Sequence, residues 1–330
     1  MRDFNLESGV KALKIIQGRV PEVSTKVVAD HGGRMTTLYI VGNGFDLWHG
    51  LPTSYGEFNA FAEEALSEFE SYYSSDFSVQ GPWCDFENTL GKFDWKAFYD
   101  DHNHIDVSSG SFRPSFIYCL EDDLAEQTNQ HVERIRECFQ EWVSEIDVSL
   151  AERKLVFAEN AKFLTFNYTS TLEIVYAVPD GQVLHIHGKA DTYEELIFGH
   201  AETIEEEPEF DEYGESTRTP FSDAEGAARY PFYALQKPVE AILKNHKAFF
   251  DALEHVDKII VVGHSLNKVD LPYFKQVAEK APTASWTVCS FKSEEGVNHA
   301  QALLQCGVTP AQIRLCGYPE LEGGLSRRRT

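Results

Sequence analysis

The chain has 330 residues, 42% of them hydrophobic and 13% aromatic, which predicts a folded protein of one large or two ordinary domains and excludes a disordered chain. Its 53 acidic and 29 basic residues give a net charge of −24, which repels nucleic-acid backbones and anionic membranes and argues against general nucleic-acid binding. No apolar run is long enough to span a bilayer, and the six cysteines form no Cys-x-x-Cys pair. We therefore expect a soluble cytoplasmic protein with reduced cysteines and no membrane contact.

The first 34 residues differ from the rest in charge, because six basic residues outnumber four acidic ones. Met35 follows directly and precedes the first clear strand. We interpret residues 1–34 as an N-terminal extension to which the sequence assigns no role, with a short helix over residues 10–16.

Residues 38–41 predict a buried parallel strand that runs into the turn Gly42-Asn43-Gly44 and a helix beginning near Asp46. Glycines permit close backbone approach, and a helix N-terminus favours an anion. The turn therefore predicts a phosphate cradle. The alternative is a plain strand-to-helix turn capped by Asp46, because the third glycine of the dinucleotide fingerprint is missing.

Residues 54–160 show helical periodicity with little strand character, which predicts a helical insert. Within it, Trp83, Phe86 and Leu90 share one face of an amphipathic helix. We expect the neighbouring Glu87 to be solvated.

Alternating strands and helices resume after the insert, which predicts a mostly parallel Rossmann-like α/β sheet with helices on both faces. We expect strands at 162–166, 183–186, 196–198, 258–262 and 286–290, and helices at 171–178, 232–255, 271–280 and 296–304. Residues 201–225 form an acidic loop, which is either a solvated excursion or a lid. The predicted organisation is a single α/β domain over residues 35–330 that contains the helical insert and this loop.

Polar and glycine residues gather where four predicted strands end. These segments are Gly42-Asn43-Gly44-Phe45-Asp46, Thr165-Phe166-Asn167-Tyr168-Thr169, His185-Ile186-His187-Gly188 and Gly263-His264-Ser265-Leu266-Asn267. Each segment could instead have a purely structural role. Asn167 could cap a helix, for example, and His187 could be a buried histidine whose hydrogen bonds are made within the core. Because ligands of such sheets bind beyond the carboxyl ends of the strands, the four segments together favour a binding site.

These segments also carry a resemblance to a known family. Together with Gly50-Leu51-Pro52-Thr53-Ser54-Tyr55 and Trp83-x-x-Phe86-Glu87, they resemble the AbiH-type bacteriophage abortive-infection family over residues 35–290. That family in turn resembles the sirtuin-like superfamily of NAD-binding folds.

The resemblance implies an NAD site, with no metal expected. Its nucleotide-binding residues would be Gly42, Asn43, Gly44, Phe45, Thr165, Gly263, His264 and Ser265. Asn167 stands where the ribose-side asparagine lies and His187 where the catalytic histidine lies.

The departures from the resemblance favour one activity. Sirtuin deacylases carry a four-cysteine zinc ribbon, which this chain lacks, whereas the related defence enzymes without the ribbon resemble NAD glycohydrolases. Asn167 would orient the ribose or a water, and His187 would accept a proton. Asp46 stands where the glycine loop of sirtuins usually has a small polar residue. A carboxylate there could bind a ribose hydroxyl or stabilise positive charge. It would also repel a phosphate.

Two other classes of function stay open. A metal-dependent hydrolase would draw its ligands from Asp46, His49, His185, His187, His200 and Asp270. A nucleotide-sensing or interaction module would bind without catalysis, and a phage-derived trigger and a homo-oligomer are compatible with either class.

Two further residues suggest chemistry more weakly. Ser265 resembles a nucleophile elbow, but Asn267 replaces the glycine that such an elbow needs, which argues against a serine hydrolase. We expect Lys237 to be an ordinary exposed lysine.

Overall fold

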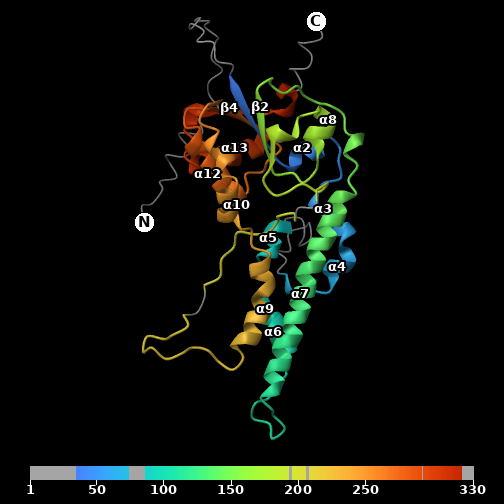
Figure 1. Cartoon of the computed structure of the whole chain (residues 1–330), viewed down its shortest axis with the longest axis vertical. Helices are drawn as coiled ribbons and strands as arrows, with labels where there is room; N and C mark the ends of the chain where they lie inside the picture. The colour runs from blue at the N-terminus through green and yellow to red at the C-terminus, as the bar shows by residue number, and fades with distance from the viewer. Residues whose placement is uncertain (1–34, 74–85, 193–194, 206–207, 292, 322–330) are drawn as a thin grey trace, which may run out of the picture. The chain divides into compact units, whose positions relative to one another are not determined.

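A computed structural model describes residues 35–73, 86–192, 195–205, 208–291 and 293–321. In this part of the chain, six parallel strands form one sheet in the order β3-β2-β1-β4-β5-β6 (Figure 1). The predicted α/β class with a parallel sheet is therefore confirmed. The strand order is that of the Rossmann fold, which reverses direction between β1 and β4.

The strands match the predicted ones closely, with one addition and one loss. Their bounds are β1 Thr36–Val41, β2 Ala161–Thr165, β3 Val183–His185, β4 Val256–Val262, β5 Ser285–Ser290 and β6 Ile313–Gly317. The edge strand β6 was not predicted. The strand predicted at 196–198 is wrong: this segment has no regular structure, and the neighbouring His200 forms only an isolated bridge with Gln236.

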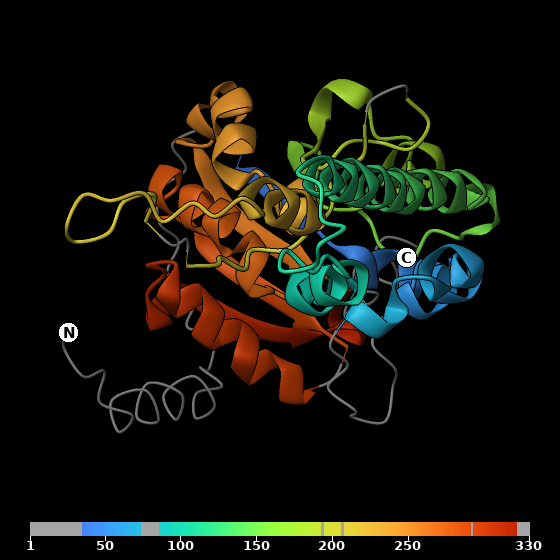
Figure 2. The same cartoon turned by 90° about the horizontal axis from the view of Figure 1, so that it is seen from below.

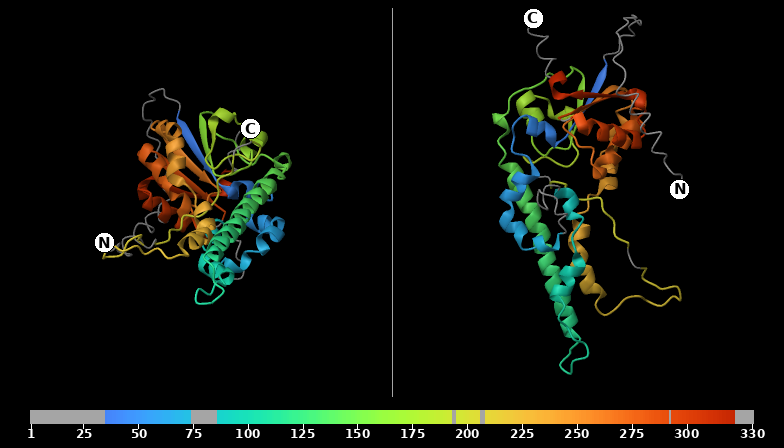
Figure 3. Two further views of the ribbon diagram at one scale, coloured as in Figure 1. Left: turned by 60° about the horizontal axis from the view of Figure 1, so that its bottom comes forward. Right: turned by 180° about the vertical axis from the view of Figure 1, so that it is seen from behind.

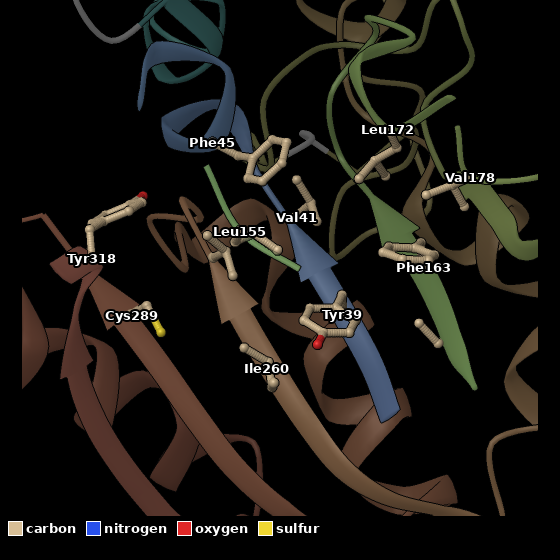
Figure 4. Packing of buried hydrophobic residues seen from close by; sticks show 12 residues of the cluster. Tyr39, Val41, Phe45, Leu155, Phe163, Leu172, Val178, Ile260, Cys289 and Tyr318 are labelled. Atoms are coloured by element: carbon tan, nitrogen blue, oxygen red, sulfur yellow. The ribbon is translucent and has the colours of Figure 1, made fainter. Parts of the chain in front are cut away.

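One face of the sheet is covered by α2 (Asn43–Trp48) and α8 (Thr171–Tyr176). Tyr39 and Val41 of β1 join Phe45 of α2 and Leu172 of α8 in one buried apolar cluster (Figure 4). Helix α2 begins at Asn43, three residues before the predicted start, and its N-cap is Gly42 rather than Asp46.

The opposite face is covered by α12 (Leu271–Lys280) and α13 (Ser293–Gln305), which connect β4 to β5 and β5 to β6 (Figure 2). Phe274 of α12 contacts Trp286 of β5, with ring centroids 6.5 Å apart. Right-handed crossovers in opposite directions place helices on opposite faces, so the central strands are buried on both sides.

The chain divides into two compact units. Among the described residues, the sheet unit comprises 35–52, 147–192 and 238–321, and the helical unit comprises those within 53–146 and 193–237. The remaining elements of the sheet unit are η3 Val148–Leu150, η4 Asp180–Gln182, α10 Val239–Asn245, α11 Lys247–Asp251, η5 Lys268–Asp270 and η6 Pro310–Gln312.

The helical unit is built around α7 (Ser115–Ser144) and α9 (Ser222–Ala234), which lie side by side (Figure 3). Its other elements are α3 Tyr55–Phe61, α4 Glu63–Ser67, η1 Glu70–Tyr72, α5 Phe86–Leu90 and α6 Trp95–His102. The helical character predicted after residue 54 is confirmed for these elements.

The single helix predicted at 232–255 is wrong. Helix α9 ends at Ala234, and α10 and α11 follow as separate short helices. Pro238 lies between α9 and α10, where a proline cannot donate the backbone hydrogen bond that would continue the helix. The start of α9 at Ser222 also makes the last residues of the predicted acidic loop helical.

Glu87 and Lys237 form a buried ion pair inside the helical unit, which corrects both predictions of solvent exposure. Their side chains are 10% and 1% exposed, and Lys237 Nζ lies 2.8 Å from Glu87 Oε1. The backbone of Lys237 also donates to the carbonyl of His200 at 2.9 Å. A buried carboxylate needs such a cation beside it, so the pair fixes the end of this unit to α5.

The prediction of reduced cysteines is wrong for two of the six. Cys289 and Cys316 are direct partners in the parallel pairing of β5 with β6, and a disulfide joins them. Their spacing of 27 residues gave no sign of this pairing. Cys119, Cys138 and Cys306 are free, and Cys84 lies outside the described residues.

Other sequence predictions fall wholly or partly outside the described ranges. These are the extension at 1–34 with its short helix and the start of the Trp83–Leu90 helix. In the ranges that the structure covers, no helix has both the length and the apolar character needed to cross a membrane.

Backbone contacts join the turn after β1 to the turn after β4. Gly42 N donates to Val262 O at 3.1 Å, and Gly44 N donates to Gly263 O at 2.7 Å. Gly263 has φ +69°, and a Cβ there would lie 2.1 Å from the amide nitrogen of Phe45. Glycine is therefore required for this approach as well as for the backbone conformation.

Replacing Lys237 by Met should destabilise the folded chain by about 3–5 kcal/mol, because it removes the cation beside a buried carboxylate. Urea unfolding followed by circular dichroism measures this change. Adding Glu87→Gln should recover part of the loss. Lys247→Met is the control: its side chain is 71% exposed and pairs with Asp251, so its effect should stay below about 1 kcal/mol. Equal effects of Lys237→Met and Lys247→Met would contradict the role of the buried pair.

Gly263→Ala should destabilise the chain by more than Gly307→Ala. Both glycines have positive φ, +69° and +90°, but a Cβ at position 307 would meet nothing within 4 Å. The Gly307 variant should therefore cost only the conformational penalty of about 1–2 kcal/mol, whereas the Gly263 variant must also push two turns apart. Thermal unfolding of both variants tests this, and equal losses would show that the contact between the turns contributes little.

Candidate functional site

The turns that follow β1, β2, β3 and β4 lie at the same edge of the sheet, because these strands are parallel and adjacent. The order reverses between β1 and β4, and open α/β sheets bind ligands beyond the carboxyl ends of the strands at such a reversal. All four polar segments found in the sequence therefore belong to one edge of the sheet unit.

Asp46, on α2 just after β1, is a buried carboxylate with an exposed fraction of 1%. Thr169 Oγ1 donates a hydrogen bond to its Oδ2 at 2.5 Å. Burial raises the pKa of Asp46 to about 6, while the Thr169, Thr171 and Asn167 side chains and the charge of His185 act in the opposite direction. A carboxyl group of this kind changes its charge near neutral pH.

Asn167 follows β2 and is also buried, with 6% of its surface exposed. Its backbone N–H donates to Thr165 Oγ1 at 3.1 Å, so Thr165 fixes the backbone that carries the asparagine. Neither Asn167 nor Thr169 caps α8, whose N-cap is Ser170. The capping alternative given for Asn167 is therefore wrong.

Two buried oxygens of predicted site residues, Asp46 Oδ1 and Asn167 Oδ1, lack a hydrogen-bond donor among the described residues, as does Glu173 Oε2 on α8. A buried polar atom left without a partner costs about 1–3 kcal/mol, so native structures seldom keep two together without a use for them. Both atoms are acceptors. The edge is thus suited to a ligand that donates hydrogen bonds.

His187 lies in the turn after β3 and is 2% exposed. Its Nε2 is 3.3 Å from the Tyr273 hydroxyl of α12, and the Phe166 ring packs edge-on against it at 5.3 Å between centroids. An imidazole nitrogen without a hydrogen can accept a proton, which is the role predicted for His187.

His185, the last residue of β3, makes two hydrogen bonds to its surroundings. Its Nδ1 is 3.0 Å from the carbonyl oxygen of Asn167, and its Nε2 is 2.8 Å from Glu173 Oε1 on α8. Lys189 Nζ lies 3.4 Å from the same carboxylate oxygen. The two histidines of the His-x-His segment are therefore in different environments.

The turn after β4 holds the remaining predicted residues. His264 is buried, its Nδ1 accepts the backbone N–H of Leu266 at 2.9 Å, and its Nε2 lies 3.5 Å from Asp270 Oδ2. Ser265 is exposed. Leu266 has φ +53°, so the chain turns sharply here even though Asn267 stands where a nucleophile elbow has glycine.

The glycine turn after β1 uses its own N–H groups within the protein. The amides of Gly42 and Gly44 donate to the β4 segment, and Phe45 N donates to Gly42 O at 2.9 Å. A phosphate at this turn would need other donors. The Phe45 side chain is fully buried in the apolar cluster, and Asn43 is half-buried.

The candidate metal ligands do not gather around a common point. Among the residues with described positions, no group of three His, Cys, Asp or Glu side chains could hold a metal ion. Both ring nitrogens of His49 are engaged, by Phe45 O at 2.7 Å and the Tyr176 hydroxyl at 2.6 Å. His200 belongs to the helical unit. The arrangement gives the metal-dependent hydrolase no support.

Sequence reasoning missed three residues that shape this edge: Thr169 as the partner of Asp46, Tyr273 beside His187, and Glu173 beside His185. Glu173 carried a usable signal, since it is the one charged residue in the short apolar helix α8. The contact of Tyr273 depends on the packing of α12, which sequence spacing does not reveal.

Asp46→Asn should stabilise the folded chain at pH 7.5 by about 3 kcal/mol, the equivalent of raising the pKa from 3.8 to about 6. Because the folded pKa is the higher one, the native chain holds this proton more tightly than the unfolded chain, and the wild type loses stability as pH rises from 4 to 6. The gain in the variant should therefore vanish near pH 4. Urea unfolding at both pH values measures it, and a pH-independent difference would contradict the assignment.

Comparison with known proteins identifies the family. A search of curated proteins and a search of solved structures gave no match. A family model described as bacteriophage abortive infection AbiH matches residues 38–290, which span β1 to the end of β5 and include every residue of the candidate site. The chain therefore belongs to the AbiH family of bacteriophage abortive-infection proteins.

Proposed function

We propose that this AbiH-family chain acts in abortive infection by binding NAD, or a closely related nucleotide, at the carboxyl edge of its sheet and hydrolysing the bond between nicotinamide and ribose. Two buried oxygens without donors, Asp46 Oδ1 and Asn167 Oδ1, are the observation that carries this proposal. The sirtuin-like resemblance of the strand-end motifs is consistent with it.

A ribose fits these two acceptors because its vicinal hydroxyls supply two hydrogen-bond donors. A phosphate supplies acceptors and negative charge, which Asp46 would repel. The nicotinamide ribose, rather than the pyrophosphate, is therefore the part of NAD that we place beside Asp46 and Asn167. The pyrophosphate would lie toward the turn after β4.

The proposed reaction breaks the bond from the ribose C1′ to the nicotinamide nitrogen. Nicotinamide leaves as a neutral molecule with the electron pair of that bond, and the ribose passes through an oxocarbenium-like state, as in other glycosidic cleavages. The carboxylate of Asp46 would stabilise this positive charge. A water adds to C1′ and gives its proton to His187.

The experiment is to incubate the purified chain with NAD and to measure nicotinamide release and NAD binding, with and without lysate from phage-infected cells as a source of the trigger. Asn167→Ala and His187→Ala should each lower the rate by about 10²-fold or more. Asn129→Ala is the control, because Asn129 is an exposed residue of α7 whose side chain donates a hydrogen bond to the Ala125 carbonyl of the same helix.

Each outcome separates the alternatives. Tight NAD binding without release in any condition would favour a non-catalytic sensing module. Neither release nor binding by the wild type, or unchanged release in both variants, would overturn the proposal.

A further inference from the structure

His185 lies between two groups that can only accept hydrogen bonds. One is the backbone carbonyl of Asn167, 3.0 Å from Nδ1, and the other is the Glu173 carboxylate, 2.8 Å from Nε2. A neutral imidazole carries one N–H and can donate to one acceptor. Hydrogen bonds to both acceptors at once need a hydrogen on each ring nitrogen, which is the imidazolium form.

This conclusion depends on Glu173 being ionised, and its surroundings favour that state. Burial acts to raise the pKa of Glu173, but the hydrogen bond and charge of His185, together with Lys189, outweigh burial and hold the pKa below its usual value. Lys189 is itself placed by Asp180 and Asp191, at 3.8 Å and 3.5 Å. The side chain of Glu173 is 10% exposed, so these charges are poorly screened by solvent.

The imidazolium acts on two of the three predicted catalytic residues, Asn167 and Asp46. Its Nδ1–H donates to the carbonyl of Asn167 and so fixes the peptide that carries the asparagine side chain. Its charge also lowers the pKa of Asp46, against the larger effect of burial. Glu173 of α8 contacts this ring, and the charge of the ring acts on Asp46 of α2. Lys189, from the segment after β3, contacts Glu173. Asp180 of η4 and Asp191 in turn contact Lys189.

We propose that His185 is a positioning residue, protonated on both ring nitrogens in the folded chain, that holds Asn167 in place and keeps Asp46 ionised, while the neighbouring His187 accepts the proton. The role in catalysis rests on the proposed NAD hydrolysis. The charge on His185 and its effect on Asp46 do not, since they follow from the hydrogen bonds and charges of the folded chain.

Two spectroscopic measurements test the charge without any substrate. Nitrogen NMR of the histidine-labelled wild type at pH 7.5 should show both nitrogens of His185 protonated. Carbon NMR of the Asp46 carboxyl should give a pKa near 6 in the wild type and a higher value in His185→Gln, in which the amide can still donate to the Asn167 carbonyl. His102→Gln is the control, because His102 also bonds a backbone carbonyl, that of Phe98, but lies in the helical unit.

A neutral His185 at pH 7.5, or an unchanged Asp46 pKa in a folded His185→Gln variant, would overturn the proposal. If that variant fails to fold, the nitrogen spectrum of the wild type still decides whether the ring is charged.

The pH profile of nicotinamide release tests the catalytic part. In His185→Gln the acid limb should move to higher pH, and a rise of about one pH unit in the Asp46 pKa would lower the ionised fraction at pH 6 about fivefold. A purely structural role would lower the rate equally at all pH values. If the wild type releases no nicotinamide, the proposed function fails while the NMR result on His185 stands by itself.

Discussion

The close approach of the turn after β1 to the turn after β4 is the constraint on which the candidate site depends. Gly42, Gly44 and Gly263 let the two backbones meet without intervening side chains, and their hydrogen bonds lock the turns at the point where the strand order reverses. Asp46 and His264 are each carried by one of these turns. A shift of either turn would therefore change the position of both halves of the site together.

The site retains features that oppose folding. Asp46 is an ionisable group placed where solvent cannot reach it, and both it and Asn167 keep an oxygen that the surrounding chain does not satisfy. Nearby, Glu173 is stabilised through one oxygen: its Oε1 contacts His185 Nε2 at 2.8 Å and Lys189 Nζ at 3.4 Å, while its Oε2 also lacks a partner among the described residues. Buried oxygens left without donors at one edge of the sheet are the pattern expected where binding, rather than stability, determines which residues are present.

The strands of the sheet and the segments that form the site could be predicted from the sequence. The contacts between side chains of different segments could not. Strands β1 and β4 each end in an apolar run, Leu38–Val41 and Ile259–Val262, that is followed by glycine, so their position was predictable to within two residues. Strand β6 is a short edge strand with one buried residue, and it lacks such a run. The Glu87–Lys237 and Cys289–Cys316 pairs join residues far apart in the chain, and local periodicity carries no information about such partners.

The pairing of β1 with β4 has a consequence for synthesis. Val41 and Val262 are register partners, so at about 5–20 residues per second the first strand must wait roughly ten seconds or more for its central neighbour to leave the ribosome. Until then Asp46 and Asn167 can already have left the ribosome, but the turn after β4 is not yet present to pack beside them. A fragment from translation interrupted before β4 therefore lacks the turn on which the candidate site depends.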